Sequence, residues 1–128
     1  MVAMNDGLPN DVKEFISQHI HSLAQLEVLL TLRREPQRLW TVDEVTSCLY
    51  LERQMVNDLL ADLVRRGLAV QHGADFQYQP ANDLIAGLIG RLAQLYQERR
   101  VAVTTEIFAK PVDSARAFAN AFRLRGKE

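Results

Sequence analysis

Residues 41–79, TVDEVTSCLYLERQMVNDLLADLVRRGLAVQHGADFQYQ, decide the fold class of this chain. Thr41 can cap a short helix that ends near Leu49, because Glu44 stands three residues later, as in a capping box. A second helix is predicted over residues 52–66. Its apolar residues recur at spacings of three and four: Met55, Val56, Leu59, Leu60, Leu63 and Val64. Only two residues separate the two helices, which predicts a helix–turn–helix unit.

A small β-hairpin is predicted directly after this unit, over residues 68–79. Gly67 stands where a helix commonly ends in the left-handed conformation. Apolar and polar residues then alternate on both sides of residues 72–75, and Gly73 suits the first position of a type II′ turn. Pro80 ends the second strand. The chain is therefore predicted to be mainly α-helical with one small hairpin.

Two helices are predicted before this stretch. Residues 1–9 show no periodicity and contain glycine and proline, so we expect a mobile leader there. A helix over residues 10–20 follows, capped by Asn10 or Asp11, and its apolar residues lie on one face. A further helix over residues 22–34 begins with a serine and a glutamine at capping-box spacing.

After Pro80 the pattern predicts one long helix from about residue 82 to Ala109, a rod of roughly 40 Å at 1.5 Å per residue. Its apolar stripe is longer than a small core can cover. Gly87 and Gly90 would allow another helix to approach closely. We expect a second copy of the chain to cover the stripe; the alternative is that the stripe folds back on the first two helices of the same chain.

A last helix is predicted after Pro111, with two phenylalanines on one face that suit a groove of the same chain or of a partner. Residues 81–128 are thus predicted to form a helical dimerisation arm. The residues expected at the dimer interface are Leu88, Leu92, Leu95, Tyr96, Phe118 and Phe122.

Composition narrows the function classes. The 128 residues suit one domain, and we find neither a secretory signal nor an apolar run that would span a membrane. Cys48 is the single cysteine, which favours a reduced, cytoplasmic protein. His19 and His21 point to different sides of a helix, so no metal site is predicted. No phosphate-binding loop or nucleophile motif occurs, so we expect neither a cofactor nor catalysis.

Charge is unevenly distributed along the chain. The net charge is −1, but residues 91–128 hold eight Lys and Arg against four Asp and Glu. The basic excess therefore lies outside the helix–turn–helix, where DNA affinity would need it.

Residues 22–80 resemble the winged helix-turn-helix domain of bacterial transcriptional regulators of the MarR/PadR-like kind. The resemblance rests on WTVDEV at residues 40–45, LADLVRRGLAV at residues 60–70 and FQYQP at residues 76–80. It implies a winged-helix domain over residues 10–80 that binds duplex DNA as a homodimer. The recognition helix would be residues 52–66 and the wing residues 68–79. A small-molecule effector is neither supported nor excluded.

The resemblance also implies roles for individual residues. Arg53 would pair with guanine, and Gln54 or Asn57 with adenine. Thr41 would donate its backbone N–H to a phosphate, and His72 at the wing tip would touch the DNA backbone or minor groove. This sequence departs from the family pattern, because Tyr50 replaces a common turn glycine and acidic residues stand on the helix and wing: Glu52, Asp58, Asp62 and Asp75. The alternative function is therefore a winged-helix module that binds another protein.

Overall fold

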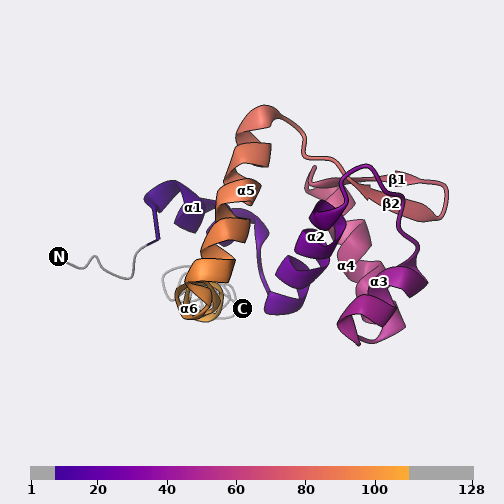
Figure 1. Cartoon of the computed structure of the whole chain (residues 1–128), viewed down its shortest axis with the longest axis horizontal. Coiled ribbons are helices and arrows are strands. Elements are labelled where there is room, and N and C mark those ends of the chain that lie inside the picture. The colour runs from indigo at the N-terminus through magenta and orange to yellow at the C-terminus, as the bar shows by residue number, and fades with distance from the viewer. Residues whose placement is uncertain (1–7, 110–128) are drawn as a thin grey trace, which may run out of the picture.

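The computed structural model describes residues 8–109 of the chain, so Phe118 and Phe122 lie outside the described residues. The elements are α1 (Asn10–His19), α2 (Leu23–Arg34), α3 (Val42–Leu49), α4 (Arg53–Arg65), β1 (Ala69–His72), β2 (Asp75–Tyr78), α5 (Asp83–Glu98) and α6 (Arg100–Ala109). In Figure 1, α1, α5 and α6 lie on one side of α2, and α3, α4 and the hairpin lie on the other. Among the described residues, no helix is both long and apolar enough to span a membrane.

The helix–turn–helix follows the sequence prediction closely. The Thr41 hydroxyl accepts a hydrogen bond from the Glu44 N–H (3.1 Å), and the Glu44 carboxylate accepts one from the Thr41 N–H (3.0 Å), which completes the capping box. Tyr50 ends α3 in the left-handed conformation (φ 57°), so a tyrosine takes the place that glycine commonly fills. Val56, Leu60 and Leu63 of α4 are fully buried in the core.

The hairpin pairs Ala69 with Tyr78 and His72 with Asp75, in the predicted antiparallel register. Gly73 has a φ of 63°, as the first position of a type II′ turn requires. The structure adds one pairing that the sequence did not predict. Trp40, just before α3, exchanges two backbone hydrogen bonds with Phe76 (2.7 and 2.8 Å) and so ties the wing to the start of the helix–turn–helix.

The N-terminal part differs from prediction in two respects. Leu8 is buried in the core and Pro9 is the N-cap residue of α1, so two residues of the expected leader belong to the packed fold and neither Asn10 nor Asp11 is the cap. Proline suits this end because its missing N–H would have no partner there. In α2 the Ser22 hydroxyl accepts from the Gln25 N–H as expected, but the Gln25 side chain accepts from the His21 N–H instead of the Ser22 N–H.

The long C-terminal helix predicted to run to Ala109 is wrong: the chain leaves helical geometry at Arg99 (φ −136°, ψ 57°) and restarts as α6. Figure 1 shows α5 along its length and α6 end on. The polar run QERR at residues 97–100 interrupts the apolar stripe at this point. After the turn, Val103 and Ile107 are buried, and α6 contacts α1.

The stripe of α5 is largely covered within one chain. Ile89, Leu92 and Tyr96 are buried, and α5 packs against α1, with an ion pair between Arg91 and Asp11. This is the folded-back arrangement that the sequence left open as the alternative.

Candidate nucleic-acid interface

A shallow groove of about 290 Å³ lies where the start of α3, the first half of α4 and the hairpin meet. Three of the five predicted DNA-binding residues, Thr41, Arg53 and Asn57, line it together. The wing contributes Gln71, Ala74, Asp75 and Phe76. The fold therefore joins α4 and the hairpin in one surface.

Arg53 is held by a neighbour that the sequence analysis did not identify. Its Nε donates to the Asp43 carboxylate over 2.6 Å, and both side chains are well exposed (67% and 75%). This exposure makes the ion pair weak, so it orients the guanidinium more than it stabilises the fold. It also cancels the positive charge in the groove. The two residues are ten positions apart, and only the helix–turn–helix geometry brings them together.

The backbone N–H of Thr41, expected to donate to a phosphate, is already occupied by the Glu44 carboxylate. The hydrogen bond from Thr41 lowers the pKa of Glu44, so this carboxylate is ionised at neutral pH. A phosphate at the same N–H would have to displace one anion and lie beside it. The phosphate contact expected of Thr41 therefore stays a prediction, and it would require the capping box to open.

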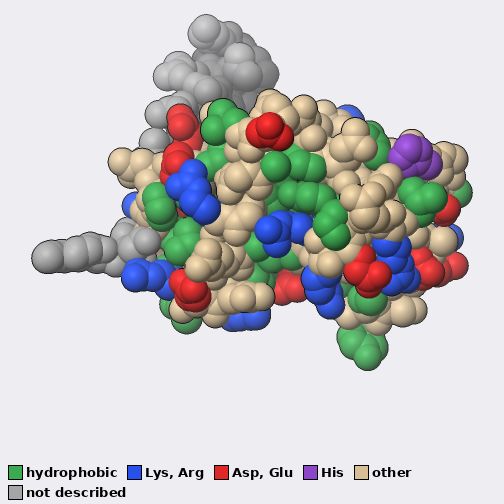
Figure 2. All heavy atoms as spheres, turned by 45° about the horizontal axis from the view of Figure 1, so that its top comes forward, with side chains coloured by type: hydrophobic (Ala, Val, Ile, Leu, Met, Phe, Trp, Pro, Cys, Tyr) green, Lys and Arg blue, Asp and Glu red, His purple; other side chains and the backbone are tan. Residues whose placement is uncertain are grey.

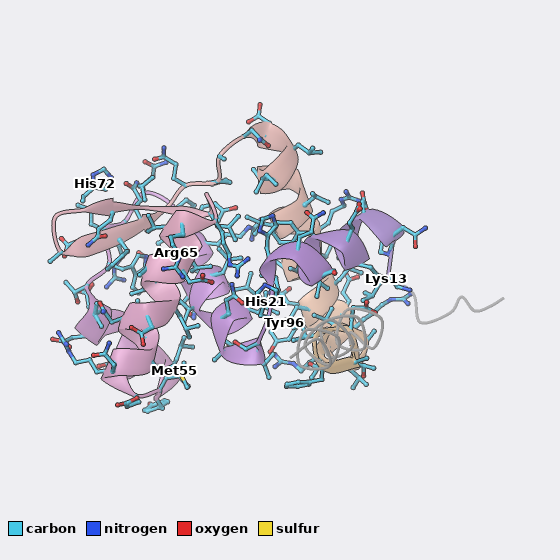
Figure 3. The ribbon with its side chains drawn as sticks, turned by 180° about the vertical axis from the view of Figure 1, so that it is seen from behind. Lys13, His21, Met55, Arg65, His72 and Tyr96 are labelled. Carbon is cyan, nitrogen blue, oxygen red and sulfur yellow. The ribbon has the colours of Figure 1, made fainter. Side chains whose placement is uncertain are left out.

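Gln54 and His72 lie outside the groove. Gln54 is exposed on the outer face of α4 and donates from Nε2 to Asp58 over 2.9 Å. His72 is exposed at the end of β1, on the hairpin (Figure 3). Gln71, which the sequence analysis passed over, takes a place on the groove. The strand alternation gives a signal for it, because Gln71 follows Val70 on the opposite face of β1.

The surface around the groove is acidic. Residues 41–79 carry three arginines, Arg53, Arg65 and Arg66, against six Asp and Glu. Arg65 and Arg66 both pair with Asp62 over 2.7 Å. On the face drawn in Figure 2, Lys and Arg side chains lie among Asp and Glu and form no continuous basic patch. Affinity for duplex DNA through this surface would rest on few phosphate contacts.

The residues predicted at the dimer interface are distributed between core and surface. Leu92 and Tyr96 are buried within the chain, while Leu88 and Leu95 are half-buried along α5. Three apolar side chains of this region are well exposed: Leu84 on α5 (72%), and Val101 (78%) and Phe108 (68%) on α6. None of these three was among the residues predicted at the dimer interface, since the prediction treated α5 and α6 as one straight helix.

Tyr96 joins the helical arm to the winged-helix part. Its hydroxyl donates to the Glu27 carboxylate of α2 over 2.6 Å, and the Arg100 guanidinium donates to the Tyr96 hydroxyl oxygen over 2.9 Å. Burial raises the pKa of Tyr96 to about 12, and the Glu27 carboxylate acts in the same direction.

Across residues 8–109, no three His, Cys, Asp or Glu side chains gather as a metal site would require.

The chain matches no protein-family model and no curated protein sequence. Its fold is similar to that of a MarR family transcriptional regulator from Silicibacter pomeroyi, with a TM-score of 0.52 and 14% identity over 92% of this chain and 83% of that one. A MarR family protein from Bacillus stearothermophilus (0.47, 18% identity, 92% and 84% covered) and a possible transcriptional regulator from Methanosarcina mazei Go1 (0.45, 20% identity, 70% and 79% covered) are more distant in structure. At these identities, similarity is a statement about the fold.

Proposed function

Because the chain has a MarR-like winged-helix fold, we propose that it is a DNA-binding transcriptional regulator that acts as a cytoplasmic homodimer and is not an enzyme. The observation that supports this best is the groove in which α4 and the wing meet, with Arg53 and Asn57 both on it. In this proposal α4 enters the major groove of DNA and the hairpin follows the sugar–phosphate backbone.

Each residue has a distinct role in the proposal. Arg53 keeps N–H donors beyond the one that it gives to Asp43, and these suit the two acceptors on the edge of guanine. Asn57 and Gln54 have the amide that pairs with adenine. His72 contacts the DNA backbone from the wing. Thr41 fixes the start of α3 through its capping box, and its N–H would reach a phosphate only if that box opened.

The proposed dimer uses the helical arm. Val101 and Phe108 on the outer face of α6 would be covered by the second copy, together with the exposed edges of Leu88 and Leu95. Leu92 and Tyr96 support this surface from inside the chain. Two copies related by a two-fold axis would then bind two half-sites of a palindromic sequence.

The test is selection from a duplex library at two salt concentrations, with the mass in solution measured alongside. A dimer that selects a palindromic site, and binds it more weakly as salt rises, supports the proposal.

Variants test the residues. Arg53→Ala should cost about 1–3 kcal/mol of binding free energy and relax the preference at one base position. Asp43→Asn should strengthen binding, because it removes a negative charge and leaves the charge of Arg53 uncompensated. Arg99→Ala, an exposed arginine between α5 and α6, is the matched control and should leave site selection unchanged.

A protein-binding module remains the second candidate, and the acidic surface favours it. Three arginines against six carboxylates across residues 41–79 would repel a DNA backbone but attract a basic protein segment. A dimer without DNA affinity even at low salt, together with one stoichiometric protein partner in a pull-down, would establish this function instead.

A further inference from the structure

A second groove, of about 500 Å³, lies on the side of α4 away from the wing, between α4 and the start of α2. We call it the α2–α4 groove. Met55 and Leu59, one helical turn apart, provide its apolar surface, and Met55 is 44% exposed. Figure 3 looks at this side of the molecule and labels Met55 on α4 and His21 just before α2. An exposed apolar side chain in an open groove is typical of a surface that binds another segment or molecule.

The rim of the α2–α4 groove is acidic. Glu52, Asp58 and Asp62 line it, with Arg66 as the one cation among its lining residues. Arg66 is committed to Asp62 and to the carbonyl oxygen of Gln18. Glu52 and Asp58 are exposed, and Asp58 accepts a hydrogen bond from Gln54. An occupant of this groove should therefore carry both apolar and basic side chains.

The chain itself supplies such an occupant. Nineteen residues follow Ala109, and they hold five Lys and Arg against two Asp and Glu, a net charge of +3. The described residues 8–109 hold ten against thirteen, a net charge of −3. The segment also has Phe118 and Phe122 four positions apart, with small residues around them, and this spacing puts both rings on one face of a helix.

The helix α6, after which the segment follows, begins close to α2. Arg100, the first residue of α6, lies 4.0 Å from Glu27 and bonds to Tyr96, which in turn bonds to Glu27. The segment therefore follows a helix that is held against α2. The N-terminal end of α2 also forms one wall of the α2–α4 groove.

We propose that residues 110–128 dock as an amphipathic helix in the α2–α4 groove of their own chain. Phe118 and Phe122 pack on Met55 and Leu59, and the arginines of the segment face Glu52 and Asp58. This assigns the two phenylalanines to the chain's own groove rather than to the dimer interface. The docking does not depend on DNA binding, so either proposal can fail without the other.

Methionine labelling offers a direct test in the full chain. The three methionines are Met1, Met4 and Met55, so methyl-labelled methionine gives one signal from the groove and two from the N-terminus. Docking places aromatic rings on Met55. We expect its methyl signal to be displaced by ring currents and to show nuclear Overhauser contacts to phenylalanine protons. The double variant F118L/F122L should return the signal to the position of an exposed methionine.

The matched control is Phe108→Leu, which removes an exposed ring from α6 and should leave the Met55 signal in place. Glu52→Lys with Asp58→Lys changes only exposed groove residues and should also release the segment. An undisplaced Met55 signal that ignores both sets of substitutions overturns the proposal. Contacts that appear only between differently labelled copies overturn it as well, because they would place the segment in the groove of a second copy.

Discussion

Gln25 is a nearly buried polar side chain that connects three elements. Its carbonyl accepts from the His21 N–H (2.6 Å), and its amide donates to the His19 carbonyl (2.7 Å) and to the Asp62 carboxylate (3.2 Å). Gln25→Leu would leave those groups without their partner, so we expect it to lower the free energy of unfolding by about 2–4 kcal/mol. Urea denaturation measures this. Gln94→Leu, which removes one exposed hydrogen bond, should change it by less than about 0.5 kcal/mol.

Tyr96 gives the fold a dependence on alkaline pH. Burial raises its pKa from 10.0 to about 12, with the hydrogen bond and charge of Glu27 adding to the effect. A group whose pKa is raised by folding stabilises the folded state fully below its unfolded pKa and loses that contribution as pH rises through the folded value. We therefore expect the difference in stability between wild type and Tyr96→Phe to shrink from pH 10 towards pH 12.

Tyrosinate absorbance checks the same assignment. Tyr96→Phe should remove the step near pH 12 from the ultraviolet titration. Tyr50→Phe changes a highly exposed ring and should leave that step in place. A step near pH 12 that survives in Tyr96→Phe would contradict the assignment.

At the scale of the elements, replacing either of two glycines with alanine should change stability in opposite directions. Gly67 ends α4 with a φ of +77°, and a Cβ there would lie 3.4 Å from that of Ala81. Gly67→Ala should therefore destabilise the chain by about 1–2 kcal/mol. Gly87 lies within α5 with nothing within 4 Å of its would-be Cβ. Gly87→Ala should stabilise by roughly 0.5–1 kcal/mol, as measured by urea denaturation. A loss at Gly87 would contradict an open face there.

The elements that the sequence predicted correctly are those with local signals. The Thr41–Glu44 capping box, Gly67 at the end of α4 and Gly73 in the hairpin each need only neighbours within a few residues. The incomplete capping box at the start of α2 shows where such local signals fail. Ser22 caps as predicted, but the Gln25 side chain turns to the His21 N–H because tertiary contacts hold it there.

The features that the sequence did not predict depend on distant contacts. At Arg99 the apolar pattern is interrupted only by the polar residues 97–100 and then resumes, so its period alone does not predict a break. The break is accompanied by the packing of α6 on α1 and by the Tyr96–Glu27 hydrogen bond. In the candidate site, the groove composition was predicted in part. Arg53 and Asn57 share the groove, but the Asp43 pair that neutralises Arg53 joins two helices across the turn and has no signal in sequence spacing.

At the scale of the whole molecule, charge divides the chain into two parts. The described residues 8–109 have a net charge of −3, and residues 110–128 have +3. Such a division favours contact between the two parts at low ionic strength and weakens that contact as salt screens it. The α2–α4 groove and the outer face of α4 share Gln54 and Asp58. A docked segment would therefore cover part of the surface that DNA binding requires.

Under both proposals, the docked segment and DNA compete for the outer face of α4. Replacing Phe118 and Phe122 with alanine keeps all five basic residues of the segment but removes the side chains that dock. If the docked form is favoured about tenfold, apparent DNA affinity should rise about tenfold, because the apparent Kd equals the intrinsic Kd divided by the fraction of undocked chains. Fluorescence anisotropy with the selected duplex measures it, and Phe108→Ala is the control. Deleting the segment is a poorer test, since the deletion also removes charges that attract DNA. An unchanged affinity alongside a displaced Met55 signal in the wild type would mean that the docked segment leaves the DNA-facing side of α4 open.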